Sequence, residues 1–500
     1  MSEPKKLNRR KFIYAGLGVL AIAAIGSIAY FAMTPPQVTQ TTSSLITSVT
    51  TPTQSTTPST TKSPSDTIRI WQLSYASELD KNKWENIFNK FTKETGIKVE
   101  VSSFGGSDIV AKCTNIFESG VVENFPDLIS PAWAMNPLWS VRGFLEPLDD
   151  IIDWLKSNYG NKIVSGALQN AYWMGPDGQR RYYAVLTGIT VGAMFWRTDI
   201  LQKIGADEKD VLEHETYNTT LYKIKEYGLD KLGLLAPLSA QCSSTGSTDC
   251  TNGFYWRFTN FAGVSPIDPA TLKVQLDDTQ EHFNAVAQVV EEYAKLYKDG
   301  INVKSALVDA GVDNNLQFIN GQVATTFNGV ASIYAVLKDR KVPFLDAVRV
   351  FPVPGNSKKN VKPRGHIDPR FMMVPARLPK ERLDLAKKFI KFFLTEENYK
   401  EWFGKDGGFG WYDAPIYSSM MEEEPYISHP VWKGVKDTIN YGGFPCIDLW
   451  RPSFGTLRDA PPTIEIGGYI LGKYQTAEEA AKAIVTRIKG LINQYDKGLP

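Results

Sequence analysis

Residues 67–101, TIRIWQLSYASELDKNKWENIFNKFTKETGIKVEV, contain three patterned segments in succession. Apolar and polar residues alternate over 67–73 and again over 97–101, which predicts two β-strands. Between them, apolar side chains recur at the spacing of one helix face, and Gly96 ends this predicted helix. The apolar residues of that face are Leu79, Trp84, Ile87, Phe88 and Phe91. A strand, a long helix and a strand at this length form a βαβ unit with parallel strands. The stretch therefore predicts an α/β fold.

The remainder of the chain continues this pattern. A short buried strand is predicted at Asp127–Ser130 and a long apolar strand at Tyr182–Trp196. Amphipathic helices are predicted over about 280–297, 383–394 and 477–492, because apolar residues recur there on one helix face. We find no internal repeat, and 500 residues are enough for two or more domains.

The bulk composition excludes several classes of protein. Hydrophobic residues make up 43% and charged residues 22% of the chain, as in ordinary globular proteins. The net charge is +1 and the body has no basic stripe, so no nucleic-acid partner is expected. The four histidines are scattered, which predicts neither a histidine-based metal site nor a Ser-His-Asp triad. We therefore expect no cofactor.

The first 66 residues predict the topology. Residues 1–11 form a basic flank, and the uncharged stretch 12–33 is long enough to cross a hydrocarbon core of roughly 30 Å. The basic flank is expected in the cytoplasm, so the rest of the chain is exported. Arg9-Arg10 also fits a twin-arginine signal, and the export route stays open. An uncleaved anchor is favoured, because no strong A-x-A cleavage site follows. Residues 34–66, almost entirely Thr, Ser, Pro and Gln, predict a flexible stalk.

Export leads to further expectations. The body should face the extracellular side of the cell membrane. Cys242 and Cys250 bracket a short loop, and an oxidising compartment favours a disulfide between them. The pairing of Cys113 with Cys446 stays open. The sequon that begins at Asn218 is a candidate glycosylation site.

The order of short motifs along 67–500 resembles the family 1 extracellular solute-binding proteins, which deliver sugars to ABC importers. The motifs are Ile68–Trp71 with Phe91–Val99, Phe125–Ile129, Gly143–Asp149, Gln317–Ala324, Phe351–Gly355 and Thr476–Ala480. Two features depart from the family pattern. The proline of its Tyr-x-x-Pro segment is missing at Tyr183–Leu186, and Asn328-Gly329-Val330 stands where a Trp is often found.

The resemblance implies an architecture. It implies two hinge-linked α/β lobes of the periplasmic-binding-protein type with a central ligand cleft, and hinges near Gly188, Val348 and 375–379. The first lobe is expected to comprise 67–188 and 348–376. The second lobe is expected to comprise 189–347 and 377–500. It further implies a binding protein without enzymatic activity, with ABC permease subunits as partners.

A sugar offers an apolar face and a rim of hydroxyl groups, so its recognition requires aromatic platforms and polar hydrogen-bonding partners. We select aromatic residues that follow predicted strands or lie in loop-like segments, and polar residues near them. The predicted ligand-binding residues are Trp71, Trp133, Trp256, Trp411, Trp450, Asn328, Asp368 and Arg451.

The predicted function is the capture of a solute, a mono- or oligosaccharide, outside the cell. Two alternatives stay open: an extracellular glycosidase that uses two carboxylates, and a binding protein for a solute other than sugar. A structural surface protein is a third interpretation. Binding of labelled oligosaccharides without product would separate a binding protein from a glycosidase.

Overall fold

The computed structural model describes residues 66–496 except 76–77, 133–135, 165, 243–247, 310–311, 405–412, 442–443, 446–449 and 459. The predicted anchor 12–33 and stalk 34–66 lie outside these residues. Among the helices that the structure describes, none is both long enough and apolar enough to cross a membrane.

The βαβ unit predicted from 67–101 is confirmed. Strand β1 (Thr67–Leu73) is followed by α2 (Glu78–Thr95) and β2 (Lys98–Phe104), and the two strands pair in parallel. Gly96 has a φ of 75°, a conformation that glycine adopts without steric cost and that ends the helix. The apolar face of α2 is buried, and its aromatic rings stack on those of a later helix, as Trp84 does on Phe393.

Within the described residues, a mixed sheet of nine strands has the order β2-β1-β3-β10-β6-β8-β7, with β11 on β10 and β9 on β6. The added strands are β3 (Leu128–Ala132), β6 (Val185–Arg197), β7 (Ala236–Ser239), β8 (Val323–Gly329), β9 (Val348–Phe351), β10 (His366–Met373) and β11 (Phe444–Pro445). Strands β4 (Tyr172–Met174) and β5 (Arg180–Tyr182) form a separate hairpin. The strands β1, β2 and β3 pair in parallel, whereas β10 is antiparallel to both β3 and β6.

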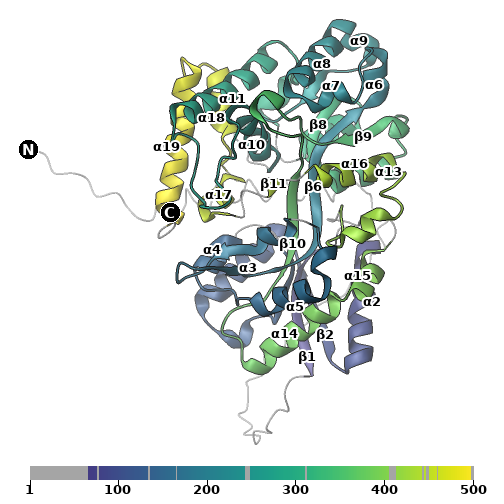
Figure 1. The fold of residues 1–500 in the computed structure, drawn as a ribbon, viewed down its shortest axis with the longest axis vertical. Helices are drawn as coiled ribbons and strands as arrows, with labels where there is room; N and C mark the ends of the chain where they lie inside the picture. Colours follow the sequence, from purple (N-terminus) through teal and green to yellow (C-terminus); the bar gives the residue numbers. More distant parts are fainter. Residues whose placement is uncertain are drawn as a thin grey trace, which may run out of the picture. The chain divides into compact units, whose positions relative to one another are not determined.

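Strand β6 links two groups of strands. Its first half pairs with β10, which in turn pairs with β3, and its second half pairs with β8 and β9. Figure 1 shows β6 and β10 as the long strands between the helices around β1 and those around β8. All residues of β6 except the last are buried, as expected for the apolar run predicted here.

Helices cover both groups of strands. Around β1 to β3 lie α2, α3 (Gly106–Ser119), α5 (Asp149–Tyr159), α14 (Lys380–Phe393) and α15 (Glu396–Phe403). Around β7 to β9 lie α8 (His214–Tyr227), α10 (Thr248–Ala262), α11 (Gln280–Lys298), α12 (Asp313–Ile319), α13 (Val330–Asp339), α16 (Pro430–Asn440), α18 (Thr463–Ile470) and α19 (Ala477–Tyr495). The shorter helices are α4 (Asn136–Val141), α6 (Thr198–Lys203), α7 (Lys209–Leu212), α9 (Leu229–Leu232) and α17 (Pro452–Gly455). The helices predicted near 280–297, 383–394 and 477–492 are confirmed.

The predicted lobe boundaries do not follow the packing throughout. Helices α14 and α15, assigned to the second lobe, pack against α2 of the first group. Strand β9, assigned to the first lobe, pairs with the second half of β6. The chain therefore crosses between the groups again after β9 and after α15, and short local motifs do not reveal these crossings.

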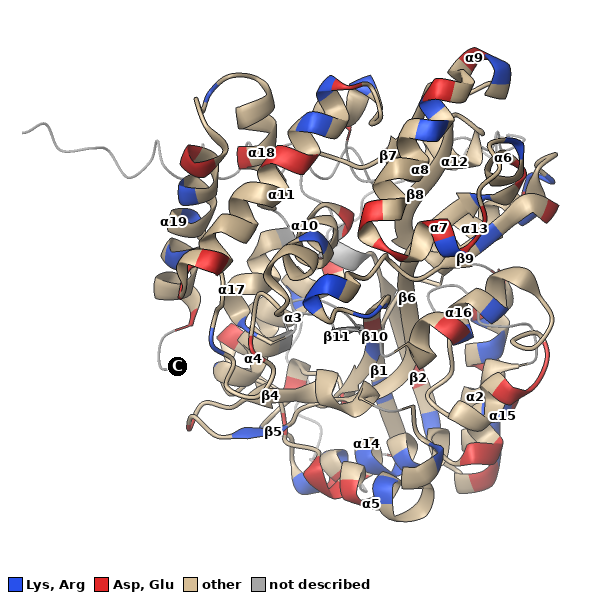
Figure 2. Cartoon of the chain, turned by 45° about the horizontal axis from the view of Figure 1, so that its top comes forward, with Lys and Arg blue, Asp and Glu red and all other residues tan. Residues whose placement is uncertain are grey.

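The charged residues are mixed over the outer helices. In the view of Figure 2, ribbon segments coloured for Lys and Arg lie beside segments coloured for Asp and Glu around α5 and α14 and again at α9. This pattern agrees with a net charge of +1 and with the absence of a basic stripe in the sequence.

Two predictions of covalent chemistry are not supported. The structure holds Cys242 and Cys250 as thiols rather than as a disulfide, although both are buried near one another. The Cys242 Sγ donates to Ala240 O over 3.4 Å, and the Cys250 Sγ donates to Gln241 Oε1 over 3.5 Å. The disulfide prediction is therefore corrected: each sulfur has a local acceptor and neither is bonded to the other. Cys446 lies outside the described residues.

The glycosylation site at Asn218 is also corrected. Asn218 lies within α8, where its side-chain Nδ2, the atom that would carry a glycan, donates to Glu292 Oε2 over 3.3 Å. The amide is half-buried against α11, so a glycan there would disrupt this contact.

Candidate ligand-binding site

The centre of the sheet gathers polar groups from several elements. Strand β6 lies between β8 and β10, with Gly192 opposite Gly329 on one side and opposite His366 on the other. A Cβ atom at Gly192 would approach Phe327 to 2.8 Å and His366 to 3.1 Å. A larger residue would not fit at this position, so glycine is required. Because β6 pairs with both neighbours here, the end of β8 and the start of β10 lie on either side of Gly192.

Asn328, at the end of β8, is the centre of a hydrogen-bonded cluster. Its Nδ2 donates to Asp249 Oδ2 over 2.6 Å and also to Asn315 Oδ1. Its Oδ1 accepts from Ser332 Oγ over 2.5 Å. These partners come from the first turns of α10, α12 and α13, so three helix starts converge on one amide. We call Asp249, Asn314, Asn315, Asn328 and Ser332 the amide cluster.

Asn314 fixes the amide cluster to the backbone. Its Nδ2 donates to Asp249 Oδ2 over 3.1 Å and to Phe327 O over 3.1 Å. The Asp249 carboxylate therefore accepts from two amides, and these charge-assisted bonds are stronger than bonds between neutral groups. Asp249 is half-buried, so the cluster reaches the boundary of the packed interior.

Strand β10 contributes a second set of polar groups. Its His366 Nδ1 lies 3.1 Å from Asn252 Nδ2 of α10, and both residues are buried. Asp368 lies opposite Thr190 of β6 and forms an ion pair with Arg370, at 2.8 Å between Oδ2 and Nη1. Residues directly opposed in a strand pair project from the same face, so His366 and Asp368 share a face with Thr190.

These groups suit the recognition of neutral hydroxylated molecules. Amides offer both donors and acceptors, the Asp249 carboxylate offers acceptors, and Ser332 offers a hydroxyl. Such a mixture can satisfy a rim of hydroxyl groups without requiring a charged ligand. In the described part of the chain, no group of three or more His, Cys, Asp or Glu is arranged to hold a metal ion.

The structure brings two of the predicted ligand-binding residues to this part of the sheet, whereas a third, Trp71, lies level with Met373 at the opposite end of β10. Asn328 is the centre of the amide cluster, and Asp368 lies on β10 across from Thr190. Trp71 of β1 is half-buried, with its ring edge-on to Phe104 at 5.1 Å between centroids. Trp133 and Trp411 lie outside the described residues.

Three predicted ligand-binding residues lie in packed surroundings. Trp256 is 2% exposed in the interior of α10, where its ring packs edge-on against Tyr217 and His214. Trp450 is 5% exposed and belongs to the main hydrophobic core. Arg451 is 1% exposed and pairs with Asp496 at the end of α19, at 2.8 Å between Nε and Oδ2. The sequence around each of these residues is typical of a loop, but the side chains are buried in the structure.

Sequence reasoning missed most of the polar groups beside Asn328. Asp249, Asn314 and Asn315 stand in the first turns of α10 and α12, Asn252 lies one turn further along α10, and His366 opens β10. For Asp249 a signal was present, because α10 follows strand β7 and polar residues at such a helix start lie at the edge of the sheet.

The comparisons with known proteins agree with this architecture. A family model described as bacterial extracellular solute-binding protein matches residues 86–428. No curated protein matches the sequence.

Several solved structures have the same fold. An ABC transporter solute-binding protein from Thermotoga lettingae, bound with alpha-D-tagatose, has a TM-score of 0.64 and 18% identity over 85% of this chain and 99% of that chain. Maltose-bound MalE3 of T. maritima has a TM-score of 0.62 and 17% identity over 85% and 99%. A sugar transporter from Arthrobacter chlorophenolicus with bound laminaribiose has a TM-score of 0.62 and 15% identity over 85% and 99%. The predicted two-lobe α/β fold is thereby confirmed.

Proposed function

The chain belongs to the bacterial extracellular solute-binding proteins, and we propose that it captures a neutral mono- or oligosaccharide between its two lobes. The amide cluster carries this proposal. It places one carboxylate, three amides and a hydroxyl at the end of β8, beside the crossing strands β6 and β10. Ligands of open α/β sheets bind at strand ends, where loops and helix starts converge.

The similar structures support a sugar as the solute. They are bound to alpha-D-tagatose, maltose and laminaribiose, which are neutral and polyhydroxylated. The amide cluster matches this chemistry, since each hydroxyl group of a sugar needs both a donor and an acceptor when it leaves water. Asp368, with its carboxylate turned to Arg370, and Trp71 are the further candidates for contact with the ligand.

We propose that β6 and β10 allow the two lobes to close on the ligand. These strands continue from one group of elements to the other, so bending near Gly188 would move the groups as rigid bodies. The expected hinges near Val348 and 375–379 flank β9 and β10 in the same region. Closure would exclude water from the amide cluster and strengthen its hydrogen bonds.

The proposed partners are the permease subunits of an ABC importer, which receive the solute. We propose that residues 12–33 tether the chain to the membrane and that residues 34–66 hold the body away from it. The support for this tether is the sequence pattern alone: a basic flank, an uncharged stretch and a Thr/Ser/Pro-rich segment.

The test is a thermal-shift screen of neutral sugars, followed by calorimetry on those that stabilise the protein. A ligand that binds only the native state stabilises it by RT ln(1 + [L]/Kd). We expect at least one sugar to stabilise the chain and to be recovered intact. Release of product from a labelled oligosaccharide would favour a glycosidase, and stabilisation by charged solutes alone would favour a solute other than sugar.

A further inference from the structure

The side chain of Asp413 contacts strand β6 at the place where this strand passes from one group of elements to the other. Asp413 is fully buried, and its Oδ2 accepts from the backbone N of Val191 over 2.8 Å. Its own backbone N donates to Ile189 O over 2.8 Å. One residue therefore holds β6 at two positions, and both positions lie just before Gly192.

Ile189 shows which edge of β6 is involved. It lies opposite Pro369 of β10 on one edge, and it pairs with Ala414 on the other. Backbone groups two residues apart in a strand point to the same edge, so the N–H of Val191 also points away from β10. Asp413 and Ala414 therefore lie on the edge opposite β10, which is the edge that β8 occupies further along.

Strand β8 begins to pair with β6 just beyond this contact. The pairing starts at Gly192 and continues to Trp196. The N–H of Val191 thus lies between the end of β8 and the pairing with Ala414. A buried backbone N–H without an acceptor costs free energy, and the carboxyl group of Asp413 supplies the acceptor at this position.

The segment that contains Asp413 belongs to the first group of elements. The backbone N of Val164, after α5, donates to Ile416 O over 2.9 Å. The Oγ of Ser418 donates to Lys162 O over 2.9 Å. The carboxyl group therefore binds β6 to the first group, whereas β8, from the second group, binds β6 from the next residue onward.

Strand β10 has a matching gap along its outer edge. On that edge β3 pairs with Phe371 and Met373, and β11 pairs with His366 and Ile367. Pro369 lies between these two pairings, and a proline has no amide hydrogen that would be left without an acceptor. Both crossing strands therefore change their outer partners at nearly the same level, and bending at this level breaks the fewest hydrogen bonds.

We propose that Asp413 is a positioning residue for lobe closure, which keeps β6 attached to the first group as far as Val191 and places the bend between Val191 and Gly192. Glycine suits a bend because it has the widest choice of backbone angles. Without the bond from Asp413, residues 189–191 would bend as well, and the angle between the lobes would be less narrowly set. This inference rests on the closure proposed above, but it does not depend on which solute is captured.

Hydrogen exchange of the full chain, without any sugar, tests the contact. Asp413→Leu has a similar size but no acceptor, and Asp413→Asn retains an oxygen that can accept from Val191. The matched control is Ser418→Ala, which removes one bond of the same segment at a distance from β6. We expect the Val191 amide to be protected in the wild type and to exchange about tenfold faster or more in Asp413→Leu. Exchange in β1 should not change, and Asp413→Asn and Ser418→Ala should behave as the wild type does.

Three results would overturn the proposal: an unprotected Val191 amide in the wild type, equally fast exchange in Asp413→Asn and Asp413→Leu, or an equal rise of exchange in β1, which would indicate general destabilisation. If Asp413→Leu does not fold, Asp413→Ser takes its place, because the shorter serine side chain does not reach the amide.

A second measurement reports the angle between the lobes. Spin labels on Leu79→Cys in α2 and Leu471→Cys after α18, both at exposed positions, give the distribution of distances between the two groups. We expect a broader distribution in Asp413→Leu than in the wild type, and no broadening in Asp413→Asn. Equal widths in all three proteins would overturn the positioning role. Failure of every sugar to bind would count against the proposed function and would leave both of these results unaffected.

Discussion

Two polar residues selected from the sequence, Asn328 and Arg451, have different surroundings in the structure. Asn328 joins three helix starts at the end of a strand, while Arg451 is buried and holds the end of α19 through Asp496. Their sequence contexts are alike, since both follow apolar segments and precede Gly or Pro. What separates them is the identity of their long-range partners, Asp249 and Asp496, which a single sequence does not supply.

Asn328→Ala should weaken the binding of the captured sugar. The substitution removes the bonds to Asp249, Asn315 and Ser332 and so loosens the groups proposed to bind hydroxyls. One or two hydrogen bonds correspond to about 1–3 kcal/mol, or roughly ten- to a hundredfold in Kd. Calorimetry measures the change, with Asn284→Ala on the exposed face of α11 as the control. Unchanged affinity in the Asn328 variant would contradict the assignment.

Arg451→Met should destabilise the fold and leave affinity unchanged. It leaves the Asp496 carboxylate, which is fully buried, without its cation. Removal of one partner of a buried ion pair costs about 3–5 kcal/mol. Denaturant unfolding and calorimetry on the same variant give the two quantities. A stable variant that had lost its affinity would return Arg451 to the ligand-binding residues.

At the scale of elements, local sequence patterns predicted the structure correctly where the elements that pack together are close in the sequence. The unit β1-α2-β2 was predicted because its alternation, its helical spacing and Gly96 all lie within 35 residues. The antiparallel pairing of β10 with β6 was not predicted, because these strands are far apart in the sequence and no local pattern identifies a strand's partner. The order β10-β6-β8 that brings His366 and Asn328 beside Gly192 was therefore hidden, and with it most of the site.

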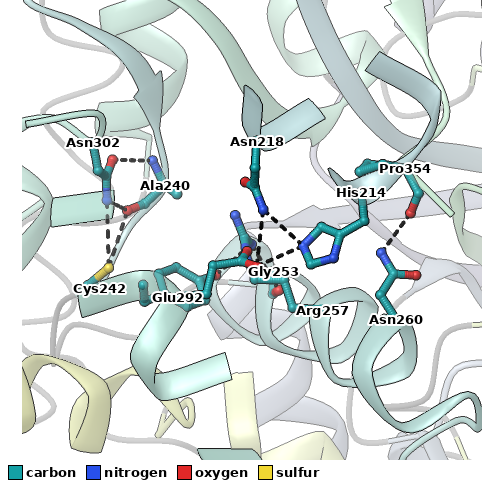
Figure 3. A network of polar contacts seen from close by, with 11 residues as sticks. His214, Asn218, Ala240, Cys242, Gly253, Arg257, Asn260, Glu292, Asn302 and Pro354 are labelled. Carbon is teal, nitrogen blue, oxygen red and sulfur yellow. Dashed lines mark hydrogen bonds and ion pairs between the residues drawn. The ribbon is translucent and has the colours of Figure 1, made fainter. Parts of the chain in front are cut away.

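In the network shown in Figure 3, Glu292 of α11 pairs with His214 of α8 and with Arg257 of α10. We expect these pairs to make the free energy of unfolding depend on pH in the acid range. The folded pKa of Glu292 is about 2, below the value of about 4.3 for an unfolded glutamate. Because the folded pKa is depressed, the stabilisation is complete above about pH 4.3 and is lost as the pH falls toward 2. Denaturant unfolding between pH 2 and 6 should show a smaller pH dependence for Glu292→Gln than for the wild type. Equal slopes for the two proteins would contradict the network.

Cys242 and Cys250, near the start of α10, are thiols, so we expect a reducing agent to leave the stability of the protein unchanged. Cys242 and Cys250 are buried and each sulfur has a local acceptor, so no disulfide contributes to stability there. Burial also raises the pKa of Cys242 well above its usual value, which disfavours the reactive thiolate. Adding dithiothreitol should leave the unfolding temperature unchanged. A clear fall in that temperature would restore the disulfide predicted from the sequence.

At the scale of the whole molecule, the order of short motifs predicted both the fold class and the family. The shared order of weak motifs along 67–500 predicted an extracellular solute-binding protein with two α/β lobes, and the match over 86–428 confirms the family. The order of motifs could not show where the chain crosses from one lobe to the other. The lobe to which α14, α15 and β9 belong is decided by the elements that they contact, and local motifs do not specify these contacts. The identity of the sugar depends on the positions of a few side chains, which motifs do not specify.

The measurement that tests the account most directly is a crystal structure of the body, residues 67–500, grown with the sugar that stabilises it most. We predict an intact sugar with hydroxyl groups within hydrogen-bond distance of Asn328 and Asp249, beside Gly192 of β6 and the start of β10. A sugar bound only at other places, or one cleaved into products at the amide cluster, would contradict the proposed function.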